Sequence, residues 1–273
     1  DFCLSRGLGD VYKRQMYEDT QLTGNSLTPR IAVNYLINPR HGLRAVYSEA
    51  IRSPDMFENN VNWSYRVTGL STPVYGQNSA QYFVKTRGPG NLDQEHMRSR
   101  ELGYNGYFVD QALNLDIKLF YDEITGMISE PLRNNQYIAS NSNASRFAGT
   151  ESQLDWQLSR ADRLRLTYAY VHAQASNRLD QRLTASNSGS AGWLRNWGQG
   201  WSSALFYYGD SALNGYRFER VDTRIAKRLA LGSKTSLELA GTLQQRLDHQ
   251  PTTFADNLYD SRHVVYFSAE LEF

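Results

Sequence analysis

The residues best suited to binding a ligand lie in one long segment, residues 53–96. Aromatic rings and arginines are interspersed there. They suit a ligand with planar rings and anionic oxygens, because rings stack on one another and guanidinium groups donate paired hydrogen bonds to such oxygens. The alternative is that these aromatic side chains only pack the segment against its neighbours. The candidate ligand-binding residues are Trp63, Tyr65, Arg66, Tyr75, Tyr82 and Arg87.

The histidines and the single cysteine indicate no metal or catalytic centre. None of the five histidines lies at a metal-ligand spacing such as HxxxH or HExxH, and Cys3 has no second cysteine with which to form a disulfide. His172 and His263 are candidates for a hydrolase site on a barrel wall, but neither has an evident serine and acid partner at the same depth. We therefore expect no enzyme activity, no metal and no cofactor.

Composition excludes several classes of protein. The 273 residues contain 29 Lys and Arg against 28 Asp and Glu, so a strongly basic nucleic-acid binder is not expected. Aromatic residues make up 12% and charged residues 21%, which is too aromatic and too weakly charged for a disordered chain. No run approaches about 18 apolar residues, which excludes a transmembrane helix but not membrane-spanning strands that alternate apolar and polar residues.

Alternation with a period of two residues dominates the chain from Leu27 onward. Successive side chains of a strand point to opposite faces, so this alternation predicts strands with one apolar face. In residues 113–122, for example, Leu113, Leu115, Ile117 and Leu119 share one face, and the other carries Asn114, Asp116 and Lys118. We expect about eleven strands: 27–37, 41–52, 97–109, 112–127, 144–159, 163–174, 185–196, 200–208, 216–229, 234–247 and 262–273.

The lengths of these strands and of their connections favour a membrane barrel over a soluble β-sandwich. Sandwich strands usually run about 5–6 residues, whereas strands of about ten residues are long enough to cross a bilayer at a tilt. Short turns alternate with long loops, and aromatic residues cluster near strand ends, as in outer-membrane barrels. The predicted fold class is therefore all-β: an antiparallel, up-and-down transmembrane β-barrel, here a partial or half barrel.

The alternation also predicts which charged side chains face the barrel lumen. Side chains that face the lumen would line a path through it; alternatively, they pair within the wall with Asp116, Asp122, Glu151 and Asp222. The predicted lumen-wall residues are Arg44, Arg52, Asp116, Arg163, Arg165, Arg220 and Arg224.

Several segments, in their order and spacing, resemble the TonB-dependent outer-membrane receptors. LTPRIAVNYLI (27–37) and GLRAVYSEAIRSPDMFE (42–58) resemble a mid-barrel hairpin of that family, and NLDQEHMRSRELGYNGYF (91–108) its re-entry strand. LDIKLFYDEITGMI (115–128), GTESQLDWQL (149–158) and LRLTYAYVHA (164–173) follow in the same order. The terminal SAELEF resembles the closing strand, which ends in Phe273. The resemblance covers roughly residues 20–273.

The resemblance implies a function and a set of partners. Such receptors import a scarce nutrient, here most simply a ferric siderophore, across a Gram-negative outer membrane, with energy from the TonB complex. Barrels of this class have about 22 strands and a plugged lumen, so the chain is expected to be the C-terminal half of the barrel domain, residues 16–273, without the plug. Membrane lipid and the barrel-assembly machinery are further expected partners, and Phe273 is the expected assembly signal. A passive outer-membrane channel or structural barrel is the alternative.

The first fifteen residues, DFCLSRGLGDVYKRQ, do not share the pattern of the rest. They resemble the translation of a sequencing-adapter read-through. We therefore predict that residues 1–15 are non-native, and we predict no strand for them.

Overall fold

The computed structural model of the protein consists almost entirely of β-strands. It describes residues 2–3, 9–73, 76–128, 136–177, 180–182, 184–211, 217–232, 234–248 and 261–273. Within these ranges, the helical elements are α1 (Met56–Asn60) and one 3-10 turn at Asp180–Arg182. No described helix has the length and apolar character needed to cross a membrane.

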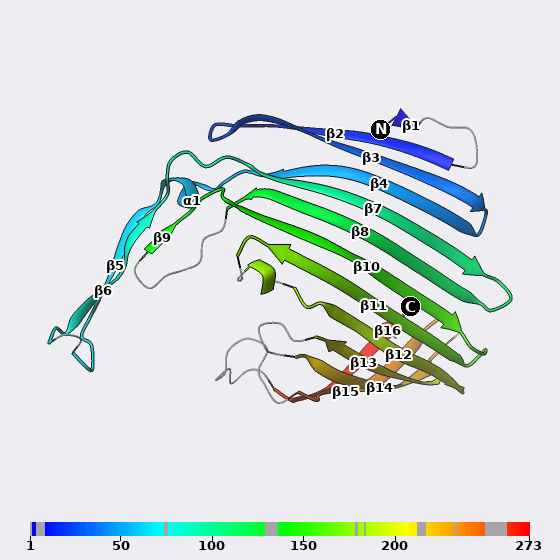
Figure 1. Ribbon diagram of the computed structural model, residues 1–273. Coiled ribbons are helices and arrows are strands. Elements are labelled where there is room, and N and C mark those ends of the chain that lie inside the picture. Colours follow the sequence, from blue (N-terminus) through cyan, green and yellow to red (C-terminus); the bar gives the residue numbers. More distant parts are fainter. Residues whose placement is uncertain are drawn as a thin grey trace.

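One curved antiparallel sheet forms the body of the molecule (Figure 1). Its thirteen strands follow the order of the chain from edge to edge, except that β5, β6 and β9 form a separate sheet. The main sheet consists of β1 (Phe2–Cys3), β2 (Gly9–Thr20), β3 (Gly24–Asn38), β4 (His41–Arg52), β7 (Glu95–Phe108), β8 (Leu113–Met127), β10 (Asn143–Gln157), β11 (Asp162–Ala175), β12 (Asn187–Gly198), β13 (Trp201–Asp210), β14 (Glu219–Ala230), β15 (Ser236–Arg246) and β16 (His263–Glu272).

The second, three-stranded sheet projects from one end of the main sheet (Figure 1). It contains β5 (Asn62–Thr68), β6 (Ser79–Arg87) and β9 (Gln136–Ile138). β5 and β6 pair as an antiparallel hairpin, and β9 adds to β6 in parallel. Two connections that are far apart in sequence, one after β4 and one after β8, therefore share a single sheet.

The sheet is open, as predicted for a partial barrel. The described strands show no pairing between β16 and either β1 or β2, so the two ends of the sheet are free edges. Every residue of β16 is exposed. The last predicted strand, 262–273, forms one free edge, whereas the first, 27–37, is not the other edge, because β2 and β1 lie beyond it.

All eleven predicted strands are present, and β2 is one that the alternation did not predict. Residues 9–15, for which the alternation predicts no strand, pair with residues 29–35 of β3. The physical reason is that β2 has no apolar stripe: the face that carries Val11 also carries Lys13 and Gln15. Pairing with β3 places this segment in the sheet without such a stripe.

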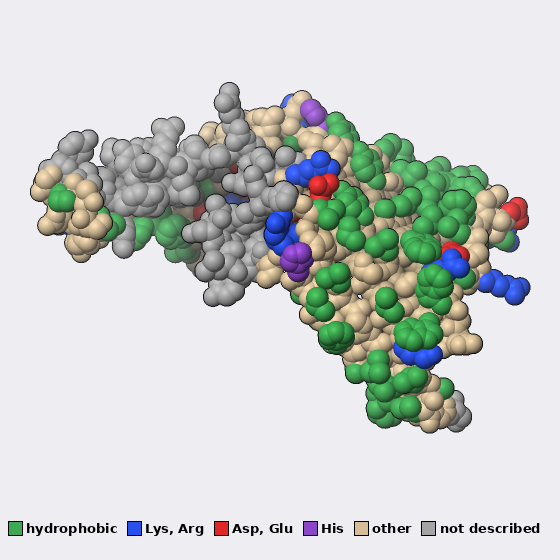
Figure 2. Space-filling model, turned by 90° about the horizontal axis from the view of Figure 1, so that it is seen from below, with side chains coloured by type: hydrophobic (Ala, Val, Ile, Leu, Met, Phe, Trp, Pro, Cys, Tyr) green, Lys and Arg blue, Asp and Glu red, His purple; other side chains and the backbone are tan. Residues whose placement is uncertain are grey.

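The register gives the main sheet one apolar face. Directly paired residues of an antiparallel sheet lie on the same face. One such row crosses five strands and contains Leu115, Leu154, Leu166, Ala191 and Tyr207. Hydrophobic side chains spread over the molecular surface in Figure 2, and Leu119 on this face is 51% exposed. Among the described residues no second layer covers this face, which is incompatible with a soluble sandwich.

The opposite face is polar over the same strands. The adjacent row contains Asp116, Gln153, Thr167, Ser190, Tyr208 and Arg220. We call this surface the polar wall. Its polarity and the apolar character of the other face together match the alternation expected of a membrane barrel.

Gly149 in β10 tests how tightly this wall is packed. A Cβ atom at Gly149 would lie 1.9 Å from the carbonyl oxygen of Tyr170 and 2.8 Å from the ring of Phe120. We expect Gly149→Ala to destabilise the refolded chain by about 1–3 kcal/mol, because the backbone of β11 must move. The midpoint of thermal unfolding, followed by circular dichroism in detergent, measures this effect.

Gly103→Ala is the matched control for that experiment. Gly103 is also in a strand on the polar wall, but the nearest atom to a Cβ there is 3.7 Å away. The Gly103→Ala variant should have the thermal unfolding midpoint of the wild type or a slightly higher one. Equal midpoints for the two variants would show that β10 and β11 separate without cost.

Candidate functional site

The polar wall holds the charged residues predicted for the lumen. The register aligns Arg44 with Gly103, Lys118 and Glu151 in one row, and Arg163 with Arg224 in another. Side chains from strands far apart in sequence therefore face the same space. This arrangement allows the wall to meet a polar or charged partner along several strands at once.

Most of these cations are held by acids on neighbouring strands. Arg163 and Arg165 both donate to the Asp155 carboxylate, with an Arg165–Asp155 distance of 3.0 Å. Arg224 Nη2 lies 2.6 Å from Glu238, and Lys118 Nζ lies 2.7 Å from Glu151. Exposed pairs of this kind each contribute little stability, about 0–1 kcal/mol. Their effect is mainly to orient the cations along the wall.

The observed partners of these charged residues differ in part from the pairs predicted from the sequence. Arg220 does pair with Asp222, at 2.8 Å. Asp116 instead accepts a hydrogen bond from Asn105 at 3.1 Å. The main acids, Asp155 and Glu238, were not identified from the sequence, because only the strand register shows that they face the arginines.

Arg44 stands apart from these pairs. It makes no hydrogen bond or ion pair with any described residue. It lines a hollow of about 580 Å³ with Glu101, Asp116 and Lys118, near the turn between β3 and β4. In the same hollow the His41 ring hydrogen-bonds to the Tyr104 hydroxyl at 2.8 Å. Arg44 therefore faces this hollow without a partner among the described residues.

The candidate ligand-binding residues occupy the projecting sheet. Trp63 in β5 is 50% exposed, and Arg66 and Arg87 are exposed as well. Tyr65 and Tyr82 are direct partners in the β5–β6 register. Tyr75 lies outside the described residues. A β-hairpin therefore carries five of the six candidates, where the sequence had indicated only a loop.

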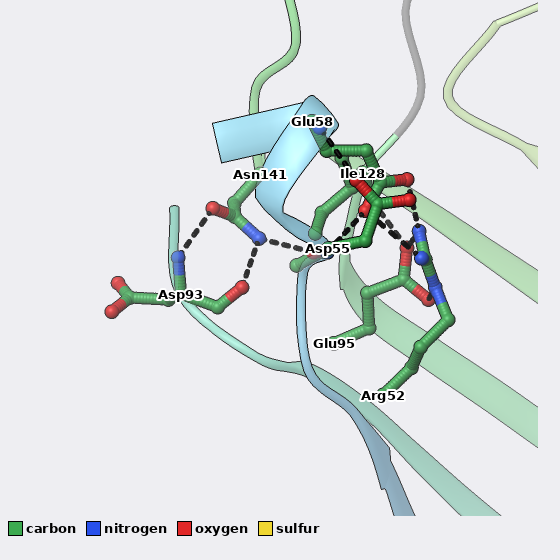
Figure 3. A network of polar contacts seen from close by, with 8 residues as sticks. Arg52, Asp55, Glu58, Asp93, Glu95, Ile128 and Asn141 are labelled. Atoms are coloured by element: carbon green, nitrogen blue, oxygen red, sulfur yellow. Dashed lines mark hydrogen bonds and ion pairs between the residues drawn. The ribbon is translucent and has the colours of Figure 1, made fainter. Parts of the chain in front are cut away.

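A cluster of polar contacts anchors this hairpin to the main sheet (Figure 3). Arg52, which was predicted for the lumen wall, is the last residue of β4. Its guanidinium group donates to both oxygens of Glu58 at 2.9 and 3.0 Å and to both oxygens of Glu95 at 3.0 Å. Glu95 also accepts from the backbone N–H of Ile128 at 2.7 Å. Asp55 and Glu58 form a capping box that starts α1. We call Arg52, Asp55, Glu58 and Glu95 the loop anchor.

A second set of contacts ties the same region to the connection after β8. The Asn141 side chain donates to the carbonyl oxygens of Asp93 and Gly126 and accepts from the N–H of Asp93, over 2.7–2.9 Å (Figure 3). Nearby, Leu92, Ile128 and Ala139 form a small buried apolar cluster. The base of the hairpin is thus fixed by polar and apolar contacts together.

The carboxyl group of Asp248, which follows β15, has a lowered pKa. Burial acts to raise the pKa of its carboxyl, but hydrogen bonds from Arg246 and from the N–H of Glu219 hold that pKa below its usual value. Because the pKa is lowered in the folded state, this contact stabilises the fold fully at a pH above the ordinary Asp pKa of about 3.9. The stabilisation is lost as the pH falls below that value and through the lowered pKa.

The described residues contain no group of three or more His, Cys, Asp or Glu side chains that could hold a metal ion. His172 lies 3.1 Å from the Gln174 amide, and His263 contacts Gln245. Neither of these recorded contacts of His172 and His263 involves a serine or an acid.

Loss of the loop anchor should release the hairpin from the wall. Arg52→Gln removes four charge-assisted hydrogen bonds, partly offset by solvent, and we expect local opening of residues 53–95 to become easier by about 1–2 kcal/mol. Hydrogen exchange of the α1 and β7 amides measures this change. Arg98→Gln is the matched control, since Arg98 is an exposed arginine whose contact with Glu49, at 3.6 Å, does not involve the hairpin. Equal exchange in both variants would contradict an anchoring role.

Comparison with known proteins places the chain in a family. A family model described as "TonB dependent receptor-like, beta-barrel" matches residues 7–244. No curated protein sequence matches the chain.

Among solved structures, the siderophore receptor PirA from Pseudomonas aeruginosa is similar at 14% identity and a TM-score of 0.65, covering 98% of this chain and 46% of that one. PirA from Acinetobacter baumannii is similar at 12% identity and a TM-score of 0.66, covering 97% and 43%. A mutant of the ferric enterobactin receptor PfeA from Pseudomonas aeruginosa, in complex with enterobactin, is similar at 14% identity and a TM-score of 0.69, covering 98% and 43%.

At these identities the structural likeness concerns the fold, and the chain spans less than half the length of these receptors. The family match covers most of the chain and agrees with an open sheet that has one apolar and one polar face. The chain belongs to the TonB-dependent receptor β-barrel family.

Proposed function

We propose that the chain is the C-terminal half of the barrel of an outer-membrane receptor that takes up a ferric siderophore. The observation that carries this proposal is the match to the receptor barrel family over residues 7–244, together with the similarity to siderophore receptors across nearly the whole chain. The two free sheet edges support a place within a larger barrel, because a sheet in a membrane must pair every edge.

In this proposal the two faces of the sheet meet different surroundings. The apolar face contacts membrane lipid, and the polar wall lines the lumen. Arg44 and the paired arginines of the wall then face a plug domain supplied by the rest of the receptor. Energy for uptake comes from the TonB complex acting through that plug.

The projecting hairpin is the proposed ligand contact outside the membrane. Trp63 offers an indole face, and Arg66 and Arg87 offer guanidinium groups, all of them exposed. Ferric siderophores present rings and anionic oxygens, which match these groups. The loop anchor ties the hairpin to the end of the main sheet, so that captured ligand is delivered toward the lumen.

Removing the hairpin should separate capture from assembly. We expect deletion of residues 62–87 from the intact receptor to abolish ferric siderophore binding while leaving its outer-membrane level unchanged, because the strands of the main sheet and the loop anchor remain. Binding of iron-labelled catecholate siderophores, including ferric enterobactin, to whole cells measures capture.

Two further variants sharpen that experiment. Combined alanine substitutions at Trp63, Arg66 and Arg87 should weaken binding at least tenfold, whereas Arg98→Ala, an exposed arginine on the main sheet, should not. Unchanged binding after the deletion would remove the hairpin from the site. Uptake that continues without TonB would instead indicate a passive channel.

The last residue tests the proposed assembly signal. Phe273 is 91% exposed and ends a stripe that also contains Val265, Phe267 and Leu271. An unpaired strand with such a stripe can be extended by the edge strand of an assembly barrel, with alternate apolar side chains docking on it. We expect the receptor lacking Phe273 to reach the outer membrane at a clearly reduced level, with unchanged siderophore affinity in the assembled fraction. Normal levels of the truncated receptor would show that Phe273 is only a wall aromatic.

A further inference from the structure

The apolar face of the sheet is hollowed over its last four strands. The hollow measures about 980 Å³ and lies over β13 to β16. Leu239 and Leu243 of β15 lie along its floor, and Ile225 of β14 and Phe267 of β16 flank it. All these side chains belong to the apolar face, because Ile225 and Phe267 both pair with Gly241, and Leu239 and Leu243 each lie two residues from Gly241 on β15.

Gly241 lies in the middle of the hollow. It pairs with Ile225 on one side and Phe267 on the other, and its neighbours on the same face of β15 are Leu239 and Leu243. A Cβ atom at Gly241 would lie 3.3 Å from the Phe267 ring. The Phe267 ring leans toward Gly241, and the furrow beside it, between Leu239 and Leu243, is lined by apolar side chains, as suits a hydrocarbon chain.

Cations stand at one end of this furrow. Lys227 lies in the same row as Trp201 and Leu239, close to the turn between β12 and β13. Its ammonium group is 5.0 Å from the centre of the Trp201 ring and donates to the Gln199 carbonyl oxygen of that turn at 2.6 Å. No carboxylate pairs with Lys227 among the described residues. Its charge is therefore presented at the edge of an apolar surface.

A second cation lies on the other side of the same turn. The Arg195 guanidinium is 4.3 Å from the centre of the Trp197 ring and 3.2 Å from Asp162, which balances part of its charge. Its Nε is buried and has no hydrogen-bond partner in the described part of the chain. We call Arg195, Trp197, Trp201 and Lys227 the cationic platform. Two cations resting on indole rings are suited to the level where hydrocarbon meets polar headgroups.

We infer that the furrow and the cationic platform together bind one anionic glycerophospholipid from the membrane leaflet on the side of the short turns. An acyl chain lies in the furrow beside Gly241, and the headgroup phosphate accepts a hydrogen bond from the Lys227 ammonium at its end. The inference rests on the proposed place of the chain in an outer membrane. The unbalanced charge of Lys227 selects an anionic lipid over a zwitterionic one.

Native mass spectrometry of the intact receptor in detergent tests this site with phosphatidylglycerol as the probe. The wild type should retain one phosphatidylglycerol. Lys227→Gln should weaken that binding about tenfold, the effect of one charge-assisted hydrogen bond, and leave weak phosphatidylcholine binding unchanged. Gly241→Leu fills the furrow against the movable end of the Phe267 ring, and it should weaken binding of both lipids.

Thr150→Leu is the matched control for the filled furrow. Thr150 pairs with Leu119 on the same apolar face but lies on β10, away from the furrow, so this variant should bind lipid as the wild type does. The inference is overturned if the wild type retains no phosphatidylglycerol, if all variants retain it equally, or if the furrow is occupied by a second receptor copy. Retention of inorganic phosphate in place of the lipid would also overturn it.

Siderophore binding is measured on the same preparations to separate the two proposals. Loss of lipid retention with siderophore binding intact would refute only the lipid site. Lipid retention without any siderophore binding would refute the proposed ligand and leave the lipid site standing.

Discussion

One continuous antiparallel hydrogen-bond ladder underlies everything else in this structure. Each strand pairs with the next along the chain, so the register of one hairpin determines that of the following one. Since direct partners share a face, the ladder sorts side chains from distant parts of the chain into common rows. Asp116 and Arg220, about a hundred residues apart, lie in one such row. The apolar face and the polar wall are both consequences of this ladder.

The ladder also explains which features could be predicted from the sequence. All eleven predicted strands are present because their apolar faces repeat every second residue, as in residues 113–122. The strand β2 was missed because its stripe is interrupted by Lys13 and Gln15. It is held by pairing with β3, which is a relation between segments and leaves no trace in the pattern of either one.

The candidate sites were predictable only as residue types. Strand alternation is enough to place Arg163 and Arg224 on one face, but the acids that hold them, Asp155 and Glu238, depend on the register between strands. The hairpin of β5 and β6 was read as a loop, since its strands are short and carry mixed side chains. Its parallel partner β9 comes from a connection some fifty residues later, which no local pattern indicates.

Neighbouring residues of one strand point to opposite faces of the sheet, so the apolar face and the polar wall can carry separate functions. In β15, Glu238 pairs with Arg224 on the polar wall, while Leu239 lines the furrow on the apolar face. A change at either position acts first on its own face, because the strand backbone lies between the two side chains and is held on both sides by the ladder. The wall can therefore change its charges without altering the apolar face, and the hairpin, whose described contacts with the main sheet lie at one end of that sheet, can change independently of both.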